Sequence, residues 1–294
     1  MAEEGSAISL DPAIAARLIV SRFPELSGEK ITPLPAEGTD NHIFRIGAHL
    51  CARFPKVPWA VATARREAAV LPRFSASPVA VPGVYGIGDP GGEYPHHWSV
   101  LSWLPGEPLG AARLADPERA ARELAAFFGF LRAQPVDADF RYGAENNWRG
   151  GPLALRAEAF DAALARLPNV DAGWAQRLWS AAVEQRAPGA QAWLHGDVHP
   201  GNILTVDGSI SGIIDWGICG VGDAACDLLS AWAVFDAPAR SVFRAALGAS
   251  DEEWLRGAGW ALSMAVIYLP YAYENGLRSD MSERMLARLK EEFG

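Results

Sequence analysis

The sequence has few cysteines and no long hydrophobic run. Its three cysteines, Cys51, Cys219 and Cys226, are an odd number at spacings that fit neither a zinc module nor a disulfide framework. Reduced thiols in the core, and hence a cytoplasmic location, are expected. The most apolar window, residues 260–273, contains Pro270 and is too short to span about 30 Å of hydrocarbon. This window therefore predicts a buried helix and no membrane span.

Positive charge is scarce as well. Lysine and arginine number 26 against 35 aspartates and glutamates, which gives a formal net charge of −9. This balance argues against nucleic acid or an anionic membrane surface as a partner and favours a cationic small molecule. The first residues, MAEEGSAISLDPA, are acidic and lack an apolar core of secretory length, so no signal peptide is expected.

The hydrophobic pattern divides the chain into two parts. Up to residue 104, five short β-rich runs, among them HIFRIG and HLCARFP, accompany two helices at about 11–23 and 60–74. After the turn-rich stretch PGEPLG, the pattern is helical at about 117–133, 153–167, 172–187, 223–235 and 252–273. We therefore expect an α+β, bilobal fold, with a small mixed-sheet N-terminal lobe (1–104) and a larger, mainly helical C-terminal lobe (105–294).

One stretch, WLHGDVHPGNILTVDGSISGIIDWG at 193–217, concentrates polar residues between apolar runs. The Asp-Gly pair at 207–208 is a strong hairpin signal. Pairing across it places Asn202 opposite Ile213, and a glycine in the second arm allows a slip of one residue. Asp215 then emerges near Asn202, and the loop that holds Asp197 curls toward the same point because it contains a Pro-Gly pair.

These three side chains form a set of oxygen donors. Two carboxylates and one amide suit a hard cation such as Mg²⁺, which takes few protein ligands and leaves coordination sites for phosphate oxygens. The third group can then serve a reacting hydroxyl. This is the arrangement that phosphoryl transfer requires.

The same residues carry a resemblance. His195, Asp197 and Asn202 match the protein-kinase catalytic loop H-x-D-x-x-x-x-N, and Asp215-Trp216-Gly217 stands where kinases carry D-F-G. The longer string HGDVHPGNIL…IIDWG…GDAACDL resembles the aminoglycoside/macrolide phosphotransferase family, relatives of choline kinase and homoserine kinase with a protein-kinase-like fold. The resemblance covers nearly the whole chain and is more specific in the helical lobe.

The resemblance implies a small-molecule kinase. ATP or GTP is the implied donor, and the acceptor is a hydroxyl of an aminoglycoside, a macrolide or a related amine-bearing or alcohol substrate. Asp197 is implied to be the catalytic base, Asn202 and Asp215 the Mg²⁺ ligands, and Asp223 and Asp227 acids that brace the catalytic loop. Kinases carry an arginine where this chain has Gly196, and no A-P-E signature follows, so protein substrates are not expected.

The resemblance also implies a nucleotide site in the first lobe. Arg53 stands where a strand lysine is expected, with Lys56 as the alternative, and arginine does not simply replace lysine. Glu67, on the following helix, is the expected partner of Arg53, and the pair would orient the α- and β-phosphates. The remaining residues implied to bind nucleotide are Gly38 in the phosphate-covering loop PAEGTDNHIF and, beside the adenine, Ser102, Trp103 and Leu104.

Two other functions stay open at this point. One is a catalytically degenerate member of the fold that binds nucleotide, since the strand lysine is missing and the glycine loop is poor. The other is a zinc-dependent hydrolase built on His195, Asp197 and His199. His195 is otherwise expected to be a packed supporting residue. Arg149, in NNWRGGPL, receives no role, because an Asn/Gly/Pro turn explains that stretch equally well.

Overall fold

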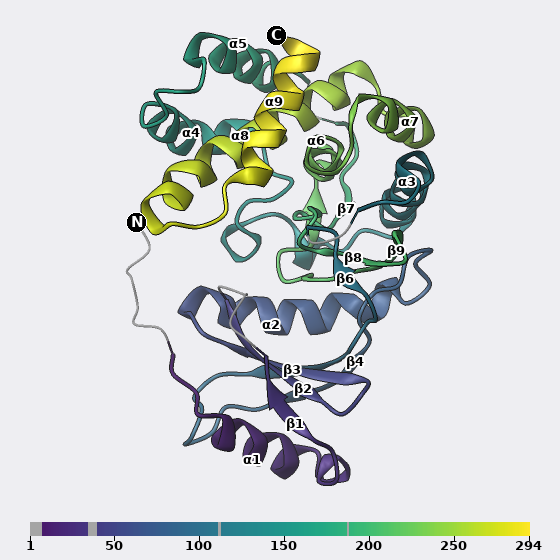
Figure 1. The fold of residues 1–294 in the computed structure, drawn as a ribbon, viewed down its shortest axis with the longest axis vertical. Helices are drawn as coiled ribbons and strands as arrows, with labels where there is room; N and C mark the ends of the chain where they lie inside the picture. Colours follow the sequence, from purple (N-terminus) through teal and green to yellow (C-terminus); the bar gives the residue numbers. More distant parts are fainter. Residues whose placement is uncertain (1–7, 35–39, 111–112, 187) are drawn as a thin grey trace.

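Residues 8–34, 40–110, 113–186 and 188–294 are described by a computed structural model of the chain. A sheet-rich N-terminal part lies against a larger helical part (Figure 1). The expected α+β, two-part fold class is confirmed. The proposed division after residue 104 falls between the last strand of the first sheet and β6 (Glu107–Pro108).

The N-terminal part is built on one five-stranded sheet. Its strand order is β1-β2-β3-β5-β4, and each of the four pairings is antiparallel, so the expectation of a mixed sheet is corrected. The reason lies in the connections: β2 and β3 form a tight hairpin, and β5 returns between β3 and β4, opposite in direction to both. The strands are β1 (Ile31–Pro33), β2 (Asn41–Ile46), β3 (Leu50–Pro55), β4 (Val84–Gly88) and β5 (Trp98–Ser102).

Two helices cover the two faces of this sheet (Figure 1). α1 (Pro12–Arg22) begins at Asp11, whose side chain accepts a hydrogen bond from the Ala13 N–H at 2.7 Å. It packs Ile19 into an aromatic cluster that includes Phe54 and Trp98, whose rings stack at 4.6 Å. α2 (Pro58–Val70) lies on the other face, between the sheet and the helical part. α2 is therefore placed to carry side chains into the junction.

Among the described residues, most of the second part is formed by seven α-helices: α3 (Pro117–Ala133), α4 (Ala157–Leu164), α5 (Ala172–Val183), α6 (Leu229–Val234), α7 (Ala237–Leu247), α8 (Asp251–Asn275) and α9 (Asp280–Phe293). The sequence reading was wrong about α7 and α9, which it did not predict. Signals for α7 were present, since Asp236 caps its first turn and Gly248 ends it at φ 68°. The apolar window is confirmed as part of a buried helix, α8. No helix in the described ranges is long and apolar enough to cross a membrane.

Two small sheets position the polar stretch at 193–217. β7 (Ala192–Leu194) pairs with β10 (Gly220–Gly222), and β8 (Ile203–Val206) pairs with β9 (Ser209–Ile213) and with β6. The predicted Asp-Gly turn is present, with φ of 49° and 73° at its two residues. The pairing shifts by one residue between Leu204 and Thr205. Asn202 therefore lies opposite Ile214, whose N–H donates to the Asn202 carbonyl at 3.0 Å, and not opposite Ile213 as the unshifted pairing predicts.

Candidate active site

The segment from His195 to Asn202 follows β7 and is tied down by a buried acid. The carboxylate of Asp227 accepts hydrogen bonds from the backbone N–H groups of His195 at 2.9 Å and Gly196 at 2.7 Å. Burial raises the pKa of Asp227 to about 6, and these two donors oppose that rise. The expectation that Asp227 braces the loop is confirmed. Asp223, the other acid of this pair, caps the turn after it and forms an ion pair with Arg256 at 2.6 Å.

His195 fastens this loop to the strand beside it. Its ring is fully buried and lies edge-on to Trp216 at 4.7 Å. Burial lowers the pKa of His195 to about 4, so the ring is neutral at physiological pH. Nδ1 accepts from the Asp197 N–H at 3.3 Å, so the proton is assigned to Nε2, which donates to the carbonyl of Ile214 at 3.2 Å. The expected supporting role fits this geometry.

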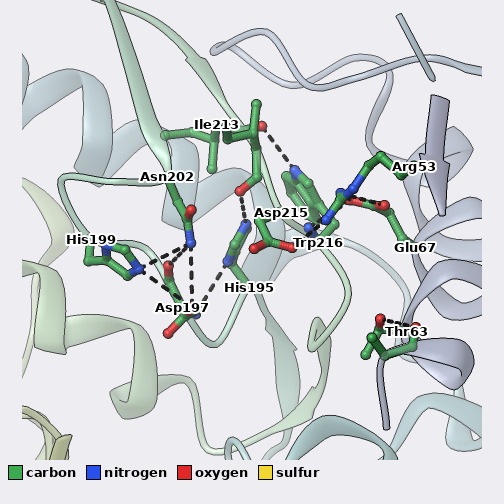
Figure 2. Close-up of polar contacts among 12 residues, drawn as sticks. Arg53, Thr63, Glu67, His195, Asp197, His199, Asn202, Ile213, Asp215 and Trp216 are labelled. Carbon is green, nitrogen blue, oxygen red and sulfur yellow. Dashed lines mark hydrogen bonds and ion pairs between the residues drawn. The ribbon is translucent and has the colours of Figure 1, made fainter. Parts of the chain in front are cut away.

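Asp197 has a partner on each carboxylate oxygen, and Figure 2 shows Asn202 and His199 beside one of them. Oδ1 lies 3.3 Å from Nη2 of Arg149, while Oδ2 lies 3.4 Å from the Asn202 amide nitrogen and 3.6 Å from Nε2 of His199. Burial disfavours the charged form, but the hydrogen bond and charge of His199, with the charge of Arg149, outweigh it. They hold the pKa of Asp197 well below its ordinary value, so the group is a carboxylate at neutral pH.

Asn202 and Asp215 approach the same place from neighbouring strand ends. The amide nitrogen of Asn202 donates to the carbonyl of Asp197 at 3.0 Å, so its amide oxygen is the atom that it offers to a ligand. Asp215 has φ 67°, a left-handed backbone that is unusual for a residue other than glycine. Its side chain is 43% exposed. Figure 2 shows it between Asn202 and the guanidinium of Arg53.

The backbone after Asp215 is anchored on α2. The N–H of Trp216 donates to Oε1 of Glu67 at 3.0 Å, and its indole N–H donates to the Ile213 carbonyl at 3.0 Å. A Cβ at Gly217 would lie 2.8 Å from Cβ of Thr63, so only glycine allows this approach. The Asp-Trp-Gly turn therefore takes its position from the helix of the other part.

Arg53 and Glu67 form the predicted contact. Nη1 of Arg53 lies 2.5 and 2.7 Å from the two carboxylate oxygens of Glu67, and Nη2 lies 3.0 Å from Oδ1 of Asp215. Glu67 is 1% exposed. Arg53 thus reaches the second part of the molecule, whereas Lys56 follows the end of β3 and its backbone bonds to Ile8 and Asp40. That Arg53 binds phosphates stays a prediction.

The remaining residues predicted to bind nucleotide lie at the connection between the two parts. Ser102 Oγ accepts from the Gly83 N–H at 2.7 Å, and the Trp103 ring lies under the guanidinium of Arg45 at 4.2 Å. Leu104 packs beside Gly212 of β9. Their place beside an adenine stays a prediction. Gly38 lies outside the described residues.

The donor set does not fit the zinc alternative. Both ring nitrogens of His195 contact backbone groups, and Nδ1 of His199 accepts from the Gly201 N–H at 3.0 Å. In the described ranges, no group of three or more His, Cys, Asp and Glu side chains is placed to hold a metal ion. Arg149, to which the sequence assigns no role, lies beside Asp197. An arginine in a glycine-rich turn is the signal that the sequence offers.

The chain is similar to known proteins both in sequence and in fold. Residues 30–261 match the model of the phosphotransferase enzyme family. Viomycin phosphotransferase of Streptomyces vinaceus is 30% identical over 272 residues, covering 83% of this chain and 84% of the relative. The structure resembles that of aminoglycoside 2'-phosphotransferase-IIIa in its GDP complex, with a TM-score of 0.71 and 21% identity over 96% of this chain and 98% of that one. It also resembles macrolide 2'-phosphotransferase type I, with a TM-score of 0.63 and 20% identity over 95% and 98% of the two chains.

Proposed function

The chain belongs to the phosphotransferase enzyme family, and from this premise we propose that it is a small-molecule kinase. It transfers the γ-phosphate of ATP or GTP to a hydroxyl of an aminoglycoside, a macrolide or a related amine-bearing or alcohol substrate. The observation that carries the proposal is the meeting of Asp197, Asn202 and Asp215 beside the Arg53–Glu67 pair. We assign nucleotide binding to residues 1–104, and catalysis and acceptor binding to residues 105–294.

Asn202 and Asp215 fit the role of magnesium ligands. An amide oxygen and a carboxylate are hard oxygen donors, and Asp215 keeps one oxygen beyond the one that Arg53 contacts. When bound, the ion supplies positive charge to the phosphate oxygens during transfer. The neighbouring acid Glu67 is buried and engaged with Arg53, so the exposed carboxylate of Asp215 is the one available to a ligand.

Arg53 is the residue that we assign to the phosphates. The Glu67 carboxylate holds one end of the guanidinium, and Glu67 itself is fixed by the Trp216 N–H. A guanidinium held in this way presents its other N–H groups in a fixed plane that matches phosphate oxygens. Nucleotide position and the geometry of the Asp-Trp-Gly turn are therefore linked through one carboxylate.

Asp197 is the residue that we assign to the acceptor. The hydroxyl oxygen forms a bond to the γ-phosphorus as the bond from that phosphorus to the β,γ-bridging oxygen breaks, and the hydroxyl proton passes to the Asp197 carboxylate. A carboxylate with a depressed pKa is a weak base. In a loose transition state the nucleophile needs little deprotonation, so orientation of the hydroxyl matters more than basicity. The partners on both oxygens of Asp197 supply that orientation.

The test is a screen for acceptor-dependent nucleotide consumption. Its acceptors are viomycin, kanamycin, a macrolide, choline and homoserine, each offered with Mg²⁺ and either ATP or GTP. The net charge of −9 favours a cationic acceptor. Consumption that needs both an acceptor and the Asp197 carboxylate would support the proposal. Nucleotide binding without turnover on any acceptor would favour the degenerate nucleotide-binding member instead.

Cellular location is a separate expectation. Cys51, Cys219 and Cys226 are all buried and free of disulfide bonds, as expected for a protein of a reducing compartment. These cysteines are consistent with a cytoplasmic location, which stays a prediction. Fractionation of the native host, with the chain traced by an antibody, would test it.

A further inference from the structure

Arg149 places a buried positive charge against the catalytic carboxylate. Nη2 of Arg149 lies 3.3 Å from Oδ1 of Asp197, and the residue is 6% exposed. Nε and Nη1 are also buried, and neither has a hydrogen-bond partner among the residues described. Burying a cation with so few partners is unfavourable. A contribution to fold stability therefore does not explain why a buried arginine stands at this position, whereas its contact with Asp197 does.

The turn that carries Arg149 is held in an unusual backbone conformation. Asn147 and Trp148 have φ of 53° and 57°, in the left-handed region that side chains disfavour. The Asn146 side chain supports this turn, because its oxygen accepts from the Gly143 N–H at 2.9 Å and its nitrogen donates to the Arg149 carbonyl at 3.0 Å. Strain of this kind persists where the surroundings hold it, and such places are often functional sites.

One glycine in the turn and one in the catalytic loop allow the two segments to pack closely. A Cβ at Gly150 would lie 2.3 Å from Cδ2 of Leu194, and the Gly150 carbonyl accepts from the Asp223 N–H at 2.7 Å. A Cβ at Gly196 would lie 3.1 Å from Cβ of Arg149. The stem of Arg149 thus lies across Gly196. That is the position where protein kinases carry an arginine within the loop itself, so here a positive charge arrives from another segment.

We propose that Arg149 is a positioning residue for Asp197. It holds Oδ1 while Asn202 and His199 lie near Oδ2, so the carboxylate keeps one rotation and stays aimed at the acceptor hydroxyl. This inference rests on the proposed function, because it concerns the same transfer. Loss of the Arg149 guanidinium should therefore lower the rate of transfer and leave nucleotide binding unchanged.

The experiment compares Arg149→Ala and Arg149→Lys with Arg240→Ala. Arg240 is a matched control, since it is 3% exposed and lies in α7, where its charged partners are Glu291 and Glu292 of α9, in the helical part. Each variant is assayed for viomycin-dependent and for acceptor-free consumption of ATP and GTP. A thermal shift with Mg²⁺ and nucleotide shows that each is folded and binds. Ethylguanidinium at millimolar concentration is added to Arg149→Ala to replace the missing group.

We expect Arg149→Ala to lower kcat by about 10²-fold, the usual effect of a misplaced catalytic group. KM for nucleotide and the nucleotide-induced shift in Tm stay as in the parent chain. Arg149→Lys and added ethylguanidinium each restore part of kcat, and Arg240→Ala lowers Tm without lowering kcat.

An active parent chain with unchanged kcat in Arg149→Ala would overturn this inference alone. The inference would also be overturned if Arg149→Ala and Arg240→Ala lost the same fraction of kcat, and if neither Arg149→Lys nor added ethylguanidinium restored any of the kcat lost in Arg149→Ala. A parent chain that consumes neither nucleotide under any condition would overturn the proposed function and this inference with it.

Discussion

Arg53 and Asp215 are 162 residues apart in the sequence, and their side chains meet at 3.0 Å. The first belongs to β3 of the sheet-rich part, and the second begins the Asp-Trp-Gly turn of the helical part. The other terminal nitrogen of Arg53 binds Glu67, which also accepts from the backbone of Trp216. One arginine therefore joins the two parts at the place where we propose that phosphates bind.

Asp197→Asn should abolish most of the transfer. The amide cannot accept the hydroxyl proton, so we expect kcat to fall by at least about 10²-fold, with nucleotide binding retained. Steady-state kinetics with the best acceptor measure the change. Asp207→Asn is the matched control, because Asp207 is exposed in the β8–β9 turn with φ 49°, a conformation that asparagine adopts readily. Full activity in Asp197→Asn would remove the assigned role.

Asp215→Asn should weaken magnesium-dependent nucleotide binding. Asparagine tolerates the left-handed backbone at this position (φ 67°), so the fold should survive. The neutral amide removes one negative charge from the proposed metal site, and we expect the Mg²⁺ concentration for half-maximal turnover to rise by at least about tenfold. Titration of Mg²⁺ at fixed nucleotide measures it. An unchanged requirement for the ion would place the metal elsewhere.

Glu67→Gln should destabilise the protein and weaken nucleotide binding. The change leaves the buried guanidinium of Arg53 without its main counter-charge, which costs about 3 kcal/mol in comparable sites. Urea denaturation measures the loss, and KM for nucleotide should rise in parallel. Glu118→Gln is the control, since Glu118 forms an exposed pair with Arg122 on α3 and such pairs contribute about 0.5 kcal/mol. Equal losses of stability in Glu67→Gln and Glu118→Gln would contradict the assignment of Glu67 as the main counter-charge of Arg53.

His195 makes stability depend on pH. Its pKa is about 4 in the folded chain and about 6.5 in an unfolded one, so between these values the unfolded state binds a proton that the folded state does not. The free energy of unfolding should therefore fall by up to about 3 kcal/mol from this group as pH drops from 6.5 to 4. Denaturation curves of the parent chain and His195→Gln, compared across this range, isolate the contribution.

Asp227 changes the free energy of unfolding with pH in the opposite direction to His195. Burial raises its folded pKa to about 6, so its contribution to stability is present below its ordinary pKa and is lost as pH rises toward 6. His195→Gln should consequently become less stable as pH rises from 4 to 6 relative to the parent chain. If the two pH profiles run parallel, the neutral, buried state assigned to His195 is wrong.

Much of the fold followed from local signals. The Asp-Gly pair specified the β8–β9 turn, and the helical periodicity located α3 and α8 to within a few residues. α7 was missed although Asp236 and Gly248 mark its ends. The register of Asn202 moved by one residue, because a bulge depends on what packs against the hairpin as well as on its turn.

The sequence by itself determined which chemical groups are available and how the backbone turns around them. Asp197, Asn202 and Asp215, with the glycines beside them, were recognisable because local spacing and backbone preference act over a few residues. The tertiary structure decided which distant side chains meet. Arg53 reaches Asp215, and Arg149 reaches Asp197 across 48 residues, because packing of many buried side chains brings their segments together. No local pattern encodes such contacts, since each depends on the summed burial of residues spread over the whole chain.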